Sequence, residues 1–151
     1  MGLALALVGF LLLATGGTTV AVEAARIAQV KKLTGQVTIL RAAGRLPAKL
    51  GNPLFEKDVV ETGADGGIGI TFIDDTVFPA GPNSQIGLDE FRFDSNNFQG
   101  EMLADMRRGT LAVASGDITR STPGAMKIKA PTPILGVRGT IFAVQLYGEH
   151  R

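Results

Sequence analysis

Large apolar residues recur at every second position through most of the chain after residue 25. Ile68, Ile70 and Phe72 show this spacing in IGITF, and Val37 and Ile39 show it in VTI. Successive side chains of a β-strand point to opposite faces of a sheet, so this spacing gives each strand one apolar face. An amphipathic helix would need apolar residues three and four positions apart. The chain is therefore predicted to fold as β-strands.

Short clusters of Gly, Pro, Asn, Asp and Ser separate the apolar runs. Glycine adopts positive φ without steric cost, and Asn and Asp side chains bond back to the nearby backbone, so such clusters turn the chain. We therefore predict an all-β domain of roughly ten short, mostly antiparallel strands, arranged as a twisted sandwich or a solenoid-like stack. The clusters lie at residues 63–67, 74–76, 81–84, 94–97, 115–117 and 122–124.

Two segments depart from the simple pattern of strands with one apolar face. Residues 100–108, GEMLADMRR, fit a short helix or a strand equally well, and the sequence leaves both open. Residues 140–147 alternate as a strand does but are apolar on both faces for much of their length. A strand with two apolar faces is usually covered on both of them. We therefore predict that this last strand is central in the sheet or covered on both sides.

The chain begins with an apolar segment of signal-peptide length. Residues 3–14, LALALVGFLLLA, carry no charge, and the first charged side chain is Glu23. Small residues flank Glu23, as a signal peptidase requires. We predict that residues 1–24 form an N-terminal helix that acts as a cleaved signal peptide, with an uncleaved inner-membrane anchor as the alternative. Residues 25–151 are then one exported domain, periplasmic or secreted.

Composition argues against several classes of function. The 15 Lys and Arg residues are balanced by 14 Asp and Glu residues, so the chain lacks the basic surplus typical of a nucleic-acid-binding protein. The chain has no cysteine, and His150 is its only histidine, one residue from the end. Thiolate catalysis, a Ser-His-Asp triad and two-histidine metal sites are therefore not expected. We expect a non-enzymatic protein with no catalytic residue, cofactor or metal.

Four motifs invite a functional interpretation, and each has a structural one that we favour. Asp74 and Asp75 could share acid and base roles, but consecutive residues at a turn diverge and face water. The oxygen-rich residues 94–97 resemble a calcium loop without its fixed ligand spacing, so we predict an Asx-rich turn. The glycine-rich residues 63–70 lead into a strand, whereas a phosphate loop leads into a helix. Of the rings in Phe91-Arg92-Phe93, we predict that one fills the core.

The motifs taken together resemble the FecR domain family. The resemblance begins at Leu33 with LTGQVTILR and continues through NPLFEKDVVETGADGGIGITFIDDTVF, GPNSQIGLDEFRFD and RRGTLAVASG to KIKAPTPILGVRGTIFAV, ending at Val144. Asp75 is a departure, because the family's hairpin usually reads Asp-Gly-Ser/Thr. The most specific stretch is a structural motif near the end of the chain, made of Gly136, Arg138, Gly139, Thr140 and Phe142.

The resemblance implies an extracytoplasmic, all-β, non-enzymatic domain. In the best-known members this domain is the periplasmic part of a transmembrane regulator, which relays an outer-membrane transporter signal to an extracytoplasmic-function sigma factor. Only the leader precedes the domain here, so we expect an isolated module that binds or scaffolds another cell-envelope protein. The alternative is an adaptor in such signalling, acting through a partner that supplies the missing segments. The sequence leaves the oligomeric state open.

Arg138 lies between two glycines inside an otherwise apolar run. A buried arginine needs a partner, and its guanidinium can donate up to five hydrogen bonds to carbonyls or a carboxylate. We therefore predict that Arg138 is a structural clamp at the start of the last strand. Its carboxylate partner could be Asp58, Glu61 or Asp117, and the sequence does not choose among them.

Overall fold

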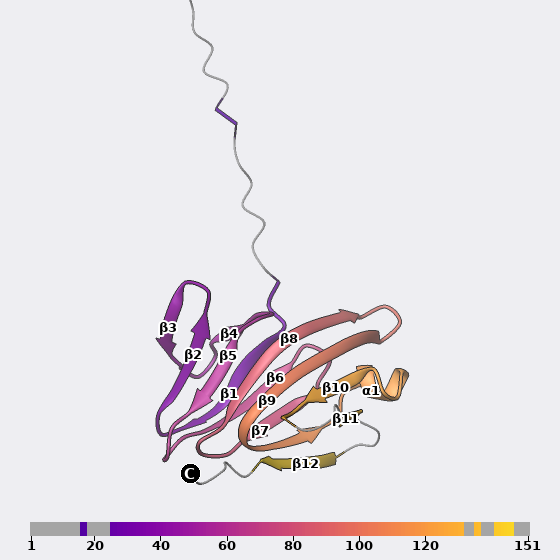
Figure 1. Cartoon of the computed structure of the whole chain (residues 1–151). Coiled ribbons are helices and arrows are strands. Elements are labelled where there is room, and N and C mark those ends of the chain that lie inside the picture. The colour runs from indigo at the N-terminus through magenta and orange to yellow at the C-terminus, as the bar shows by residue number, and fades with distance from the viewer. Residues whose placement is uncertain (1–15, 18–24, 132–134, 137–140, 147–151) are drawn as a thin grey trace, which may run out of the picture.

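The computed structural model describes residues 16–17, 25–131, 135–136 and 141–146. Most of these residues belong to β-strands that form one strongly curled sheet, and nearly all strand pairs are antiparallel (Figure 1). The prediction of a mostly antiparallel all-β domain is therefore confirmed. The predicted N-terminal helix lies outside the described residues, apart from residues 16 and 17.

The sheet has two halves that share its longest strand, β9 (Gln99–Ala114). We call the first half A; it contains the C-terminal part of β9 and runs in the order β4-β1-β6-β7-β9-β12. Its other strands are β1 (Ala28–Thr34), β4 (Pro53–Leu54), β6 (Gly67–Phe72), β7 (Val77–Ala80) and β12 (Ile141–Leu146).

Half B contains the N-terminal part of β9 and runs in the order β3-β2-β5-β8-β9-β10-β11. A short helix, α1 (Asp117–Ser121), connects β9 to β10, and the β9–β10 pair is parallel. The remaining strands are β2 (Val37–Arg41), β3 (Gly44–Pro47), β5 (Val59–Thr62), β8 (Gln85–Asp94), β10 (Met126–Lys129) and β11 (Leu135–Gly136).

Residues 100–108, which the sequence left open between helix and strand, belong to β9. Met102, Ala104 and Met106 are buried, whereas the residues between them are partly or fully exposed. A period of two is the pattern of a strand that buries one of its faces, and this explains why the segment is a strand and not a helix.

The two halves enclose a single hydrophobic core. Phe72 of half A stacks on Phe91 of half B with the ring centroids 5.4 Å apart, and it meets Phe78 edge-to-face at 4.8 Å. These geometries are the favourable ones for aromatic pairs. The prediction that one ring of the Phe91–Phe93 motif fills the core is confirmed for Phe91, which is buried.

The prediction for the last strand is wrong. β12 pairs with β9 along one edge, and no strand within the described residues pairs with its other edge. Val144 points into the core and is 8% exposed, but Ile141 on the opposite face is 80% exposed and Ala143 is also exposed. The strand is apolar on both faces for most of its length, Gln145 being the exception, yet the described part of the protein covers only one face.

Candidate functional site

Four chain corners, at which the backbone passes between the two halves, stack side by side. They are the β1–β2, β5–β6 and β7–β8 turns and the bend inside β9 at Gly109. Backbone bonds join neighbouring corners: Gly63 donates to the Gln36 carbonyl at 2.8 Å, Asn83 donates to the Gly63 carbonyl at 3.1 Å, and Gly81 donates to the Thr110 carbonyl at 3.0 Å. We call these stacked turns the corner row. They satisfy backbone groups that the turns would otherwise leave unpaired.

Two buried hydroxyls complete the corner row. The Thr62 hydroxyl donates to the Gly81 carbonyl at 2.7 Å and accepts from the Ser84 N–H at 2.8 Å. The Ser84 hydroxyl oxygen accepts from the Thr110 N–H at 3.0 Å. Both side chains are buried and bonded to backbone, so they tie strands together and are poorly placed to meet a substrate.

The bend in β9 requires glycine. Gly109 has φ of +93°, and a Cβ there would lie 2.1 Å from Ser84 Oγ and 2.4 Å from Ser84 Cα. The positive φ already disfavours other residues, and the close approach removes the space for a side chain. Gly109 therefore allows β9 to belong to both halves of the sheet.

The structure overturns the expectation that Asp74 faces water. Its carboxylate is 0% exposed and accepts three hydrogen bonds: from Thr76 N–H at 3.1 Å, from the Thr76 hydroxyl at 2.8 Å and from Ile118 N–H at 3.2 Å. Asp75 does face solvent, with a left-handed φ of 67°. The two carboxylates diverge, as predicted, so they do not form an acid–base pair. Asp74 is buried because the chain that follows β9 crosses over the turn.

Gly116 brings that crossing segment against the β6–β7 turn. Its N–H donates to the Thr76 hydroxyl oxygen at 3.1 Å, and the next residue, Asp117, donates to the Asp74 carbonyl at 2.8 Å. A Cβ on Gly116 would lie 2.2 Å from the Asp74 carbonyl oxygen. We call the group formed by Asp74, Thr76 and Gly116 the turn clasp. It pins two parts of half A that lie about 40 residues apart in the sequence.

The Asp58 carboxylate is also buried, at 1% exposed, and belongs to a separate polar cluster. It accepts from Arg41 Nε at 2.9 Å, from Arg41 Nη2 at 2.8 Å and from Phe55 N–H at 2.9 Å. The Arg41 guanidinium also lies 4.9 Å from the centroid of the Phe55 ring and donates to the Pro53 carbonyl at 3.2 Å. The hydrogen bonding that Arg41 donates to Asp58 raises the pKa of Arg41, more than burial lowers it.

Sequence reasoning named Asp58 only as a partner for Arg138 and missed Arg41. The other two carboxylates named for that role also have arginine partners: Glu61 lies 3.2 Å from Arg45, and Asp117 lies 3.2 Å from Arg120. Residues 138–140 lie outside the described residues, so the clamp stays a prediction. Of the same motif, Gly136 pairs with Lys127 in the sheet, and Phe142 pairs with Val113.

The remaining motifs have structural roles. Asp94 Oδ1 accepts from Asn96 N–H at 2.9 Å, and Asn97 Oδ1 accepts from Gln99 N–H at 3.0 Å, which confirms the Asx-rich turn. The glycine-rich residues 63–70 lead into β6, a strand, as predicted. Within the described ranges, no three His, Cys, Asp or Glu side chains are grouped so as to hold a metal ion.

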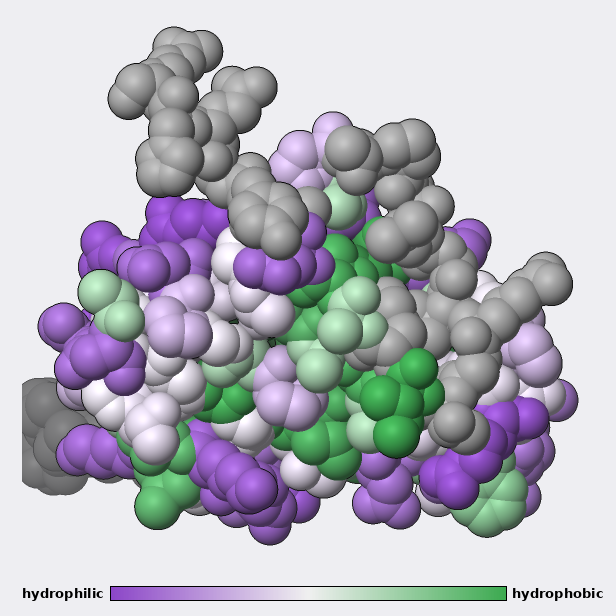
Figure 2. Space-filling model, turned by 90° about the horizontal axis from the view of Figure 1, so that it is seen from below, coloured by the Kyte–Doolittle hydropathy of each residue, from purple (hydrophilic) through white to green (hydrophobic). Residues whose placement is uncertain are grey.

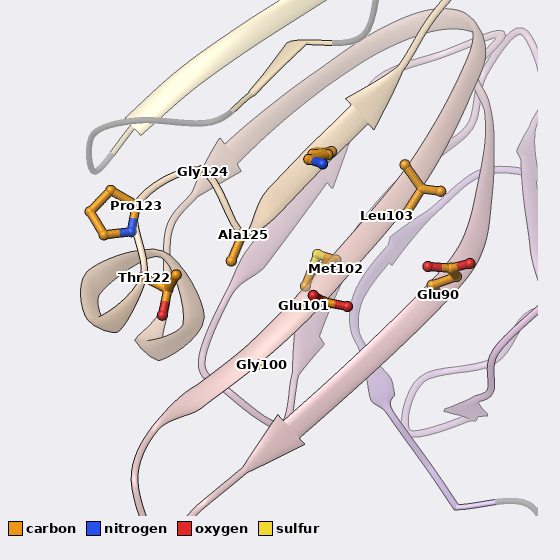
Figure 3. Close-up of a pocket in the computed structure, with 10 residues that line it drawn as sticks. Glu90, Gly100, Glu101, Met102, Leu103, Thr122, Pro123, Gly124 and Ala125 are labelled. Atoms are coloured by element: carbon orange, nitrogen blue, oxygen red, sulfur yellow. The ribbon is translucent and has the colours of Figure 1, made fainter.

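A groove of about 670 Å³ lies beside the loop that follows α1. Figure 3 shows its wall, with Thr122 and Pro123 on the loop and Glu101 and Leu103 on β9. Glu90 of the neighbouring strand also lines it. The groove is shallow and open to solvent, and it offers two exposed carboxylates without a buried partner for acid–base chemistry.

The outward surface of half A is different in character. Val77 of β7 and Ile141 of β12 both pair with Ala114 of β9, and Ala143 pairs with Ala112, so these side chains form one surface. Figure 2 views this side of the molecule, where β7 and β12 lie, and shows hydrophobic residues gathered near its middle. We call this surface the neutral face; its residues, exposed or half-buried and all uncharged, are Val77, Pro79, Ala112, Ala114, Ile141 and Ala143.

The outward surface of half B carries both signs of charge. Glu61, Glu90 and Arg92 point outward from β5 and β8 there, and Lys127 and Lys129 point outward from β10. A mixed charged surface is typical of a face in contact with water, whereas exposed apolar patches mark interaction sites. The neutral face is therefore our candidate functional site.

Comparisons with known proteins found no matching family model, no matching curated protein and no matching solved structure. The resemblance to the FecR domain family therefore stays a prediction. Among the residues that the structure describes, no helix has the length and hydrophobicity needed to cross a membrane.

Proposed function

We propose that this chain is an extracytoplasmic, non-enzymatic protein-binding module of the FecR-domain type, which binds another cell-envelope protein through the neutral face. The observation that carries the proposal is the contrast between the two outward surfaces. Half B carries charged side chains on β5, β8 and β10, whereas β7, the C-terminal part of β9 and β12 present uncharged ones, which are small or apolar apart from the polar Gln145 and Thr110. Burying such a surface against a partner is favourable because no charged group has to be desolvated.

The buried polar groups support a scaffold rather than an enzyme. Thr62 and Ser84 bond within the corner row, Asp74 bonds within the turn clasp, and Asp58 is paired with Arg41. A catalytic group must reach a substrate, and each of these groups is engaged with the protein's own backbone or with an arginine. The stacked corners also support the finer description of the fold as a solenoid-like stack.

The apolar residues 3–14 support export, since they have the length of a signal-peptide core. In this proposal residues 1–24 direct the chain out of the cytoplasm, and the domain from residue 25 onward works in the periplasm or at the cell surface. An uncleaved leader would hold the same domain at the inner membrane.

A capture experiment from envelope extracts tests the proposal. Pro79→Lys places a charge on the neutral face, at an exposed position of β7 on the side away from β12. Gln99→Lys adds the same charge at an exposed position of β9 in half B and serves as the matched control. We expect one envelope protein to be captured by the wild type and by Gln99→Lys, but not by Pro79→Lys, with all three giving the same circular dichroism spectrum.

The identity of the captured protein separates the two versions of the function. A transporter or an anti-sigma protein would support the signalling adaptor, and any other envelope protein would support a binding or scaffolding module. Capture that is equally strong with Pro79→Lys would contradict binding through the neutral face.

A further inference from the structure

The described sheet has four edge strands, and three of them are protected against pairing with other chains. β3 is four residues long and contains both Arg45 and Pro47, β4 has two residues and begins with Pro53, and β11 has only two residues. Short length, proline and charge are the usual means by which proteins blunt an edge. β12 has none of them: its six residues, IFAVQL, include no proline and no charged side chain.

We infer that β12 pairs in antiparallel fashion with β12 of a second copy of this chain, about a twofold axis. Half A of the two copies then becomes one continuous sheet. This inference does not depend on the proposed function, because it concerns the backbone edge of β12, although two residues of the neutral face, Ile141 and Ala143, lie on that strand. It also places two neutral faces side by side on one surface, which doubles the area offered to a partner protein.

The chemistry of β12 favours a second copy over a foreign strand. An uncharged strand brings no repulsion when it faces its own copy, and antiparallel pairing of identical strands is self-complementary, as a twofold dimer requires. No charged group on β12 or on the adjacent neutral face selects a partner of opposite charge. The ladder of backbone donors and acceptors along the edge supplies the attraction.

The alternation of β12 restricts the register. Val144 points inward and Ala143 points outward, so inward residues of one copy must lie beside inward residues of the other. With the twofold axis at Ala143, that residue faces its own copy, and Ile141 faces Gln145. Ile141, which is 80% exposed in the single chain, then gains a neighbour across the interface.

A single-cysteine experiment tests this register. The chain contains no cysteine, so Ala143→Cys introduces the only thiol. Directly opposite residues in antiparallel strands have Cα atoms about 4.5–5.5 Å apart, inside the range of about 4.4–6.8 Å that a disulfide spans. Ala112→Cys is the matched control, because Ala112 lies on the same face but one strand further in. Its two copies would be about 14 Å apart, three strand spacings, which is too far for a disulfide.

We expect the purified wild-type protein to sediment as a dimer, Ala143→Cys to form a covalent dimer on mild oxidation, and Ala112→Cys to form at least tenfold less. Ala143→Lys places like charges opposite each other and should give a monomer with an unchanged circular dichroism spectrum. Pro79→Lys lies two strands from the edge and should remain dimeric. A Pro79→Lys variant that remains dimeric but no longer captures its partner would therefore show that dimer formation and partner binding are separate properties.

Three results would overturn the inference. The first is a wild-type monomer whose Ala143→Cys variant stays uncrosslinked. The second is equal crosslinking through Ala143→Cys and Ala112→Cys, which would indicate two neutral faces packed against each other. The third is a monomeric wild type that captures an envelope protein, with capture abolished by Ala143→Lys but not by Pro79→Lys. That result would indicate that β12 binds a different protein and not a second copy.

Discussion

Replacing Asp74 with alanine removes the acceptor at the centre of the turn clasp. Its carboxylate accepts from the Thr76 N–H, the Thr76 hydroxyl and the Ile118 N–H, and it is fully buried. The hydroxyl can rotate to another partner, but both backbone N–H groups lose theirs. A buried donor without a partner costs about 1–3 kcal/mol, so with two such donors we expect Asp74→Ala to lower the free energy of unfolding by about 2–6 kcal/mol.

The measurement is urea-induced unfolding followed by far-ultraviolet circular dichroism. Asp74→Asn keeps one acceptor oxygen but turns an amide NH2 toward a donor, so we expect a loss of about 1–3 kcal/mol. Asp75→Asn is the control, because it removes the same charge from the exposed neighbour and still tolerates the left-handed backbone. It should change the free energy of unfolding by less than about 0.5 kcal/mol. An Asp74→Ala variant as stable as Asp75→Asn would refute the clasp.

Three further predictions concern the bend in β9, the buried ion pair and the leader. Gly109→Ala should lower the free energy of unfolding by about 3 kcal/mol or more in a urea titration, because of its positive φ and the contact with Ser84. Gly81→Ala, whose Cβ would have ordinary contacts, should cost less than about 1 kcal/mol, and equal losses would contradict the close approach. Arg41→Lys should cost about 2 kcal/mol through lost bidentate bonding to Asp58, against less than about 0.5 kcal/mol for the exposed Arg45→Lys, both measured as urea midpoints. N-terminal sequencing of the exported protein should begin near residue 25, and a sequence that begins at Met1 would indicate an uncleaved anchor.

Local patterns in the sequence predicted the parts of this fold that depend on neighbouring residues. The period of two located β6 around Ile68, Ile70 and Phe72, and the oxygen-rich residues 94–97 predicted an Asx turn because their bonds span only two residues. Strands and turns of this kind are encoded by residues close together in the chain.

Contacts between distant segments could not be predicted in this way. The burial of Asp74 depends on Ile118, 44 residues further along, and the partner of Asp58 is Arg41, 17 residues before it. Both carboxylates look like surface residues until the curled sheet brings their donors to them. The prediction for the last strand was wrong for a related reason. Two apolar faces indicate that both are buried against something, but they do not indicate whether the same chain or another molecule buries them.

The most direct test of the account is crosslinking in cells from a photoreactive side chain at either of two exposed positions. Residue 79 lies on the neutral face of half A, and residue 101 points outward from β9 in half B. If the buried polar groups hold the sheet together and the neutral face binds the partner, position 79 will crosslink to an envelope protein and position 101 will not. Crosslinks from position 101 alone, or none from either position, would contradict the account.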